Sequence, residues 1–166
     1  MEEVFVELII KRKTGLKEFL LRALSVMVVM FVFLLTIGLG MLGITITVLL
    51  GYAAYLAWTY TSIEYEYSFL NGELTIDKIM GKRKRKSVDS FDIKQAEIIA
   101  PTYSDEIIRT TGSVSKTFDY SSGYRSDKLY SIIMNNGNGN IQVVFEPDER
   151  IIDAMHHMRP SIVKKA

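Results

Sequence analysis

The most pronounced pattern along the chain is an apolar run over residues 23–63 that contains no Asp, Glu, Lys, Arg or His. As one straight helix the run would extend roughly 60 Å, about twice the hydrocarbon thickness of a bilayer. A Gly-rich stretch at residues 38–43 predicts that the chain turns back near the middle. We therefore expect a transmembrane helical hairpin over residues 16–60, with helices at about 16–37 and 43–60. The run is too long for a cleaved signal peptide, whose apolar core spans only ~7–15 residues.

From residue 61 onward the hydrophobic period changes to two, which is typical of strands with one buried face. Asn71-Gly72 predicts a tight β-hairpin, because both central positions of a type I′ turn need a positive φ. A short helical turn with Ser104 as its cap is expected, and a helix with Pro147 in its first turn should close the domain. Seven strands are predicted, at residues 63–69, 73–80, 82–88, 96–100, 114–120, 130–134 and 141–145. The core should include Phe69, Leu74, Ile76, Ile98, Phe118, Ile132, Val143, Phe145, Ile151 and Met155.

Residues 1–15 form an N-terminal amphipathic segment whose pattern fits two structures. Val4, Phe5, Leu8 and Ile9 recur at helical spacing, and Val4, Phe5, Val6 and Ile9 suit a strand equally well. We expect a short helix on the inner membrane surface. A strand added to the soluble domain is the alternative.

Positive charge flanks the predicted hairpin on both sides, and the turn at its middle is uncharged. Short basic flanks stay in the cytoplasm. We therefore expect a multi-pass protein of the cell membrane with cytoplasmic N and C termini and a cytoplasmic domain at residues 61–166. The net charge is only +1, so the basic residues are local and general nucleic-acid binding is disfavoured.

The second predicted helix carries a stripe of small residues, Gly43, Thr47 and Gly51, which recur every four residues. Such a stripe lets helices approach closely. It fits packing against the first helix, and it also fits self-association into a homo-oligomer.

Several short motifs of the C-terminal part resemble small bacterial membrane proteins in which a pleckstrin-homology-like (PH-like) domain follows two transmembrane helices. They are Tyr65-Glu66-Tyr67, residues 71–77, Gly81-Lys82-Arg83, residues 119–123 and residues 145–149. The resemblance covers most of residues 61–159. It implies an α+β membrane protein: a two-helix hairpin, then a small antiparallel β-barrel or sandwich closed by a C-terminal helix. The lipid site of eukaryotic relatives uses basic residues in the first hairpin loop. Here that loop is the uncharged Asn71-Gly72, so the resemblance does not extend to this lipid site.

A run of basic residues follows the second predicted strand of the domain: Lys82, Arg83, Lys84, Arg85 and Lys86. The first strand leaves the membrane and the second returns toward it, so this run should reach the inner leaflet and contact anionic lipid headgroups. The alternative is an edge strand whose charges prevent edge-to-edge pairing.

Candidate catalytic groups are few. His156 and His157 are adjacent near a helix end, with Asp153 one turn earlier, and they read best as solvated side chains. Glu64 and Glu66 share a strand face, either as a carboxylate pair or as solvated positions. The chain has no Cys. We predict no catalytic residues, no metal site and no cofactor.

These observations favour a membrane-anchored cytoplasmic module that recruits or positions a protein partner at the inner membrane surface, with auxiliary contact to anionic lipid. The alternative is a small membrane-bound enzyme or ligand-handling subunit whose site lies in the insert at residues 102–127.

Overall fold

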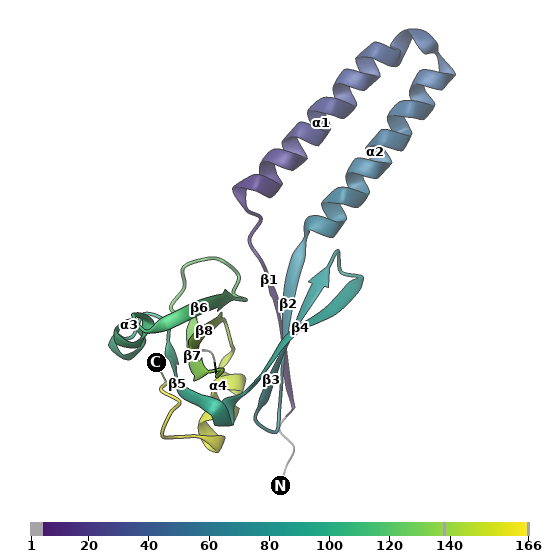
Figure 1. Cartoon of the computed structure of the whole chain (residues 1–166). Helices are drawn as coiled ribbons and strands as arrows, with labels where there is room; N and C mark the ends of the chain where they lie inside the picture. Colours follow the sequence, from purple (N-terminus) through teal and green to yellow (C-terminus); the bar gives the residue numbers. More distant parts are fainter. Residues whose placement is uncertain (1–4, 138, 166) are drawn as a thin grey trace. The chain divides into compact units, whose positions relative to one another are not determined.

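The computed structural model describes residues 5–137 and 139–165 (Figure 1). The prediction that involves Val4 lies outside the described part. The described residues form two compact units. One unit holds residues 14–63 together with the short segment 80–84, and the other holds the rest of the chain.

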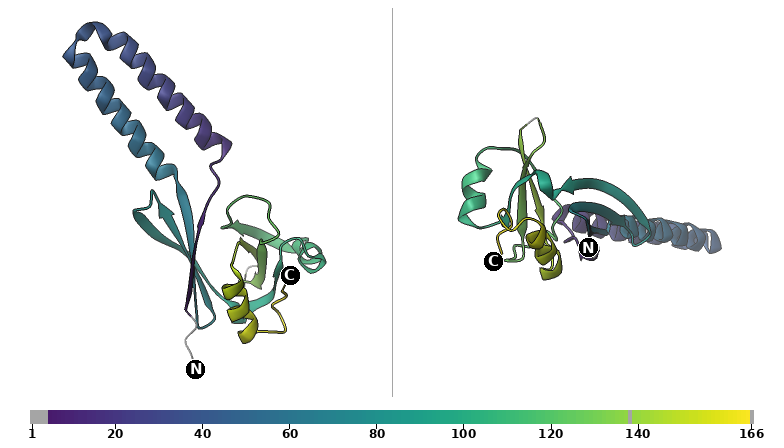
Figure 2. Two further views of the ribbon diagram at one scale, coloured as in Figure 1. Left: turned by 180° about the vertical axis from the view of Figure 1, so that it is seen from behind. Right: turned by 90° about the horizontal axis from the view of Figure 1, so that it is seen from below.

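The first unit is a pair of helices, α1 (Leu16–Thr36) and α2 (Met41–Thr61), which run side by side in Figures 1 and 2. A 3₁₀ turn, η1 (Ile37–Leu39), and Gly40 connect them, with Gly40 at a φ of 58° that favours glycine. Both helices are long and apolar enough to cross a membrane. The predicted helical hairpin is confirmed, and its turn lies in the Gly-rich stretch as expected.

The second unit contains two four-stranded sheets. The first has the order β1 (Val6–Lys11), β2 (Ile63–Leu70), β3 (Glu73–Met80) and β4 (Lys84–Asp92). The second has the order β5 (Ala96–Pro101), β7 (Tyr130–Asn135), β8 (Asn140–Phe145) and β6 (Val114–Asp119). The sheets remain separate and sandwich-like (Figure 2). β1–β2, β5–β7 and β7–β8 pair antiparallel, as expected, whereas β6 and β8 run parallel.

The N-terminal segment is a strand, so the helix predicted there was wrong and the alternative holds. β1 pairs antiparallel with β2, from Val6 opposite Phe69 to Lys11 opposite Glu64. The backbone N–H of Lys13 also donates to the carbonyl of Ser122 at 2.7 Å. A helix this short gains little stability by itself, whereas the edge of β2 offers a partner for every second backbone group.

Two helices complete the second unit, the short α3 (Asp105–Thr111) and the closing helix α4 (Glu149–Met158). Ser104 caps α3 as expected. The cap of α4 is Asp148, so Pro147 precedes the helix and does not lie in its first turn. A second 3₁₀ turn, η2 (Ile93–Gln95), links β4 to β5.

The core lies between the two sheets and α4. Eight of the ten predicted core residues are buried; Ile98 and Phe118 are only partly buried. Tyr67 is fully buried, and its hydroxyl donates to the carbonyl of Tyr120 at 2.7 Å and accepts from the Glu146 N–H at 3.3 Å. The Tyr67 and Phe145 rings meet edge to face at 5.9 Å. Tyr67 therefore joins the first sheet to the second.

Candidate functional site

The basic turn between β3 and β4 lies against the C-terminal end of α2. The Gly81 N–H donates to the carbonyl of Ser62 at 3.0 Å. A Cβ atom on Gly81 would lie 2.9 Å from the carbonyl oxygen of Thr59, and its φ of 60° also favours glycine. Lys82 follows with a φ of 59°, which completes the reversal. The structure thus brings this turn to the residue where α2 ends.

Lys82, Arg83 and Lys84 are exposed, and none of their side chains has a polar partner among residues 5–137 and 139–165. Lys84, Arg85 and Lys86 continue the run into β4. Arg85 and Lys86 belong to the other compact unit. Of the predicted lipid-contacting residues, Lys82, Arg83 and Lys84 therefore lie in the same unit as the helices.

Arg85 has a partner within its own unit. Its guanidinium lies 2.5 Å from a carboxylate oxygen of Glu66 and 4.0 Å from one of Asp77. The Glu66 side chain is only 4% exposed. Glu66 is therefore not the solvated position that strand alternation suggested, because the neighbouring strands cover it and Arg85 balances its charge.

Polar side chains connect the N-terminal part of α1 to the C-terminal end of α2, the ends that we predict to face the cytoplasm. The indole N–H of Trp58 donates to the hydroxyl of Ser25 at 2.8 Å, and that hydroxyl donates to the Arg22 carbonyl at 2.7 Å. The Arg22 guanidinium reaches the hydroxyls of Thr61 and Ser62, both at 3.5 Å. The sequence did not predict these contacts, because its pattern identifies Arg22 only as one of the basic residues that flank the helical hairpin.

Two residues of the small-residue stripe, Gly43 and Thr47, lie close to Thr36 of α1. A Cβ on Gly43 would lie 2.0 Å from the carbonyl oxygen of Thr36, so glycine is required for this approach. The Thr36 and Thr47 hydroxyls are 3.4 Å apart. The Cβ position of Gly51, in contrast, meets no atom within 4 Å.

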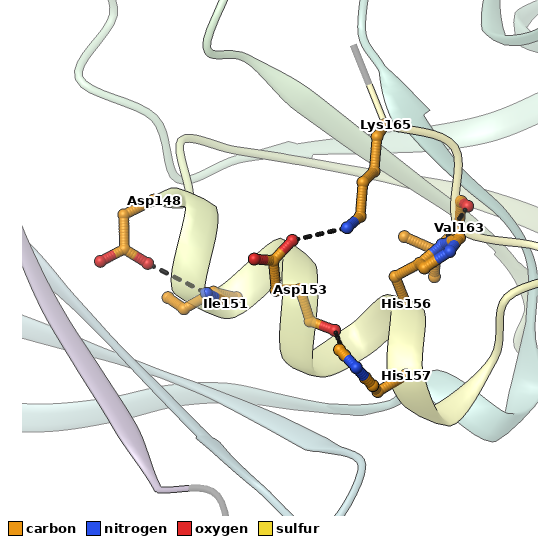
Figure 3. A network of polar contacts seen from close by, with 7 residues as sticks. All are labelled: Asp148, Ile151, Asp153, His156, His157, Val163 and Lys165. Atoms are coloured by element: carbon orange, nitrogen blue, oxygen red, sulfur yellow. Dashed lines mark hydrogen bonds and ion pairs between the residues drawn. The ribbon is translucent and has the colours of Figure 1, made fainter.

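A groove of about 630 Å³ opens beside the first turn of α4. Its lining carries both signs of charge and consists of Asp127, Lys128, Tyr130, Pro147, Asp148, Glu149, Arg150, Ile152, Asp153 and Lys165. Lys165 hydrogen-bonds Asp153 at 2.7 Å and lowers the pKa of that carboxyl (Figure 3). A general acid needs the opposite shift, so Asp153 is suited to pairing with cations.

The two histidines contact backbone carbonyls (Figure 3). His156 donates from Nδ1 to Val163 at 3.0 Å, and His157 donates from Nδ1 to Asp153 at 2.8 Å. His156 is half-buried, so the expectation that both are solvated was wrong for this residue. It holds the C-terminal tail, whose Val163 also forms a parallel bridge with Ile99 of β5. Across residues 5–137 and 139–165, no group of three or more His, Asp or Glu side chains is arranged to hold a metal ion.

The insert at residues 102–127 forms α3, β6 and the loop that follows. Ile107 of α3 is buried against Ala100 and Ile133, so this helix covers the second sheet. In the loop, the Tyr120 hydroxyl bonds the carboxylate of Asp89. Burial is the main cause that raises the pKa of Tyr120, and the hydrogen bond with Asp89 is the second cause. From the insert, Asp127 lines the groove beside α4.

Together these features define a PH-like α+β module combined with two helices of membrane-spanning length. The chain belongs to the family described as Bacterial PH-like domain (DUF6106), whose family model matches residues 2–165. The match includes the helical hairpin, so the hairpin belongs to the family's pattern along with the sheets. No curated protein and no solved structure matches the chain.

Proposed function

We propose that the protein is a membrane-anchored binding module that positions a protein partner at the inner membrane surface, with auxiliary contact to anionic lipid. The helices anchor it, and the basic turn supplies the lipid contact. The observation that carries the proposal is the hydrogen bond from the Gly81 N–H to the Ser62 carbonyl, 3.0 Å long, at the end of an apolar helix. It supports a position of Lys82, Arg83 and Lys84 near the headgroups, where each basic residue contributes roughly 1 kcal/mol.

A fluorescence experiment on the full-length chain in bilayers tests the lipid contact. The chain has no Cys, so Lys84→Cys provides a single labelling site while Lys82 and Arg83 remain. Nitroxide-bearing headgroups should quench the label more strongly in bilayers rich in phosphatidylglycerol than in neutral ones. The difference should fade as salt shortens the Debye length.

A charge-matched pair of variants controls this experiment. Lys82→Ser with Arg83→Ser should abolish the preference for anionic bilayers. Lys116→Ser with Lys164→Ser removes the same charge from other exposed positions and should leave it intact. Equal quenching in the two bilayers at low salt would contradict the lipid contact.

The groove beside α4 is the surface we assign to the protein partner, because its volume of about 630 Å³ and mixed charges suit polar side chains. A photoreactive residue at Lys128, which lines the groove, should give one defined crosslinked product in native membranes. The same residue at Glu106, exposed on α3 and outside the lining, is the control. Identical products from the two positions would count against the assignment.

A further inference from the structure

We propose that Arg22 and the basic turn form a site for the phosphate group of one anionic phospholipid at the end of α2. The inference rests on the proposed lipid contact and sharpens it, from general attraction to a defined headgroup site. It is carried by the polar contacts of Arg22, by the charges of the unit that holds it, and by the turn at Gly81.

The Arg22 guanidinium has unused donors. Its Nε is buried and has no hydrogen-bond partner within residues 5–137 and 139–165. Its contacts to Thr61 and Ser62, both at 3.5 Å, are longer than a good hydrogen bond. The Thr61 hydroxyl already donates to the carbonyl of Trp58 at 2.8 Å. A buried donor without an acceptor is costly, so the guanidinium is ready for a strong acceptor.

Protein carboxylates are scarce around Arg22. Glu18 is the one acidic residue in the compact unit of residues 14–63 and 80–84. It lies one helical turn before Arg22, the spacing of an ion pair, yet no ion pair forms. The Glu18 carboxylate is directed back toward Gly15, whose Cβ position lies within 4 Å of it. Arg22 therefore has no acidic partner among the described residues of this unit.

Other contacts hold the site in place before any ligand arrives. The bond from Trp58 to Ser25 fastens α1 to α2 one turn away from Arg22. Ser62 is contacted both by the Arg22 side chain and by the backbone N–H of Gly81. Arg22 and the turn that carries Lys82 and Arg83 thus meet at one residue.

The chemistry of this arrangement fits a phosphate group. A guanidinium binds two phosphate oxygens in a fork, and ammonium groups add charge without fixed geometry. A lipid is the source we assign, because exposed apolar side chains continue along both helices from this level, including Leu21, Leu24 and Tyr55. Acyl chains attached to the bound phosphate would lie along that surface. The additional cations favour a headgroup with net negative charge over a zwitterionic one.

Native mass spectrometry of the full-length chain tests the site. The chain is first equilibrated in nanodiscs with equal amounts of phosphatidylglycerol and phosphatidylcholine, then released into detergent at high salt. We expect one retained phosphatidylglycerol per chain. Arg22→Gln should lower its occupancy about tenfold, as expected for one charge-assisted interaction. Arg22→Lys should also lose most of it, because the fork is gone.

Lys17→Gln is the matched control, since Lys17 is an exposed basic residue of the same helix, and it should retain the lipid. Unchanged fluorescence of Trp58, the single tryptophan, would show that the hairpin persists in Arg22→Gln. Equal occupancy in Arg22→Gln and the unmodified chain overturns the site. Displacement of the lipid by equimolar inorganic phosphate overturns the assignment to a lipid.

These results separate from those of the quenching experiment. Salt-sensitive quenching at position 84 without an Arg22-dependent lipid leaves the general lipid contact and removes the defined site. An Arg22-dependent lipid without such quenching removes the contact of Lys82 and Arg83 with the bilayer surface, and with it their part in the site.

Discussion

At the residue scale, a few buried polar atoms determine how the two sheets meet. The Tyr67 hydroxyl satisfies two backbone groups just beyond strands of the second sheet, at Tyr120 after β6 and at Glu146 after β8. Burial raises the pKa of Tyr67 above its ordinary value. The neutral phenol is thus part of the folded structure.

Tyr67→Phe should destabilise the sheet domain by about 1–3 kcal/mol, because the buried Tyr120 carbonyl and the partly buried Glu146 N–H lose their partner. The pH dependence follows from the raised pKa. A phenol that ionises less readily when folded contributes stability below its ordinary pKa of about 10, and this contribution is lost as the pH rises above it. The difference in unfolding temperature between Tyr67→Phe and the unmodified chain should therefore shrink above about pH 10. A difference that grows with pH would contradict this assignment.

Glycines of the second helix provide another prediction at this scale. Gly43→Val should destabilise the hairpin by about 1–3 kcal/mol, because the new side chain would overlap the Thr36 carbonyl. Gly51→Val places its side chain in open space and serves as the matched control. Thermal unfolding in detergent measures both. A larger effect at Gly51 would indicate that this position packs against a second copy of the chain.

Single-residue environments were the hardest features to predict from the sequence. Strand alternation identified Tyr65, Tyr67 and Phe69 as one face, and all three are buried. The same alternation suggested that Glu66 faces solvent. Alternation shows which side chains share a face of the strand, but it cannot show that Arg85, nineteen residues later in the sequence, pairs with Glu66. The contacts of Arg22 were missed for a similar reason. Its partners, Thr61 and Ser62, lie 39 and 40 residues later in the sequence, at the C-terminal end of the other helix.

At the element scale, the main feature is the position of the helical hairpin between two paired strands. β1 leads into α1, α2 leads into β2, and Lys11 lies opposite Glu64 in the ladder. The helices therefore replace the turn of a β-hairpin. Sequence patterns predicted the helices and most strands because each has a clear period. The N-terminal segment was assigned to a helix, with the strand as the alternative, because a short apolar segment fits either period and its partner lies beyond the helices.

This arrangement predicts how a soluble domain can be made. Replacing residues 14–62 with a short Gly-containing loop should preserve the β1–β2 pairing and give a soluble domain with cooperative unfolding. A chain that begins at Ser62 lacks β1 and should aggregate, because the edge of β2 is then exposed. Size-exclusion chromatography and circular dichroism compare the two. A chain from Ser62 that is monomeric and equally stable would show that β1 is dispensable.

At the scale of the whole molecule, strand pairing constrains the topology. β1 and β2 belong to one sheet, so the segments before α1 and after α2 occupy the same side of any membrane that the helices cross. The basic flanks then favour the cytoplasmic side. Charge in the sequence and pairing in the structure are independent arguments, and both favour the same side of the membrane for the segments before α1 and after α2.

Cysteine labelling on intact cells measures this topology, because the natural chain has no Cys. An impermeant reagent should label Leu39→Cys in the turn between the helices and should not reach Ser126→Cys in the sheet domain. After the membrane is permeabilised, both positions should react. Labelling of position 126 alone on intact cells would reverse the orientation.

The insertion of the helices between β1 and β2 also has a consequence for biosynthesis. The ribosome makes β1 first, yet its partner strand emerges only after both helices have been synthesised. If a single helix crosses the membrane, β1 and β2 end on opposite sides and the first sheet cannot close. In a membrane, closure of the first sheet would therefore require that both helices insert, and a chain with one inserted helix would leave the edge of β2 uncovered.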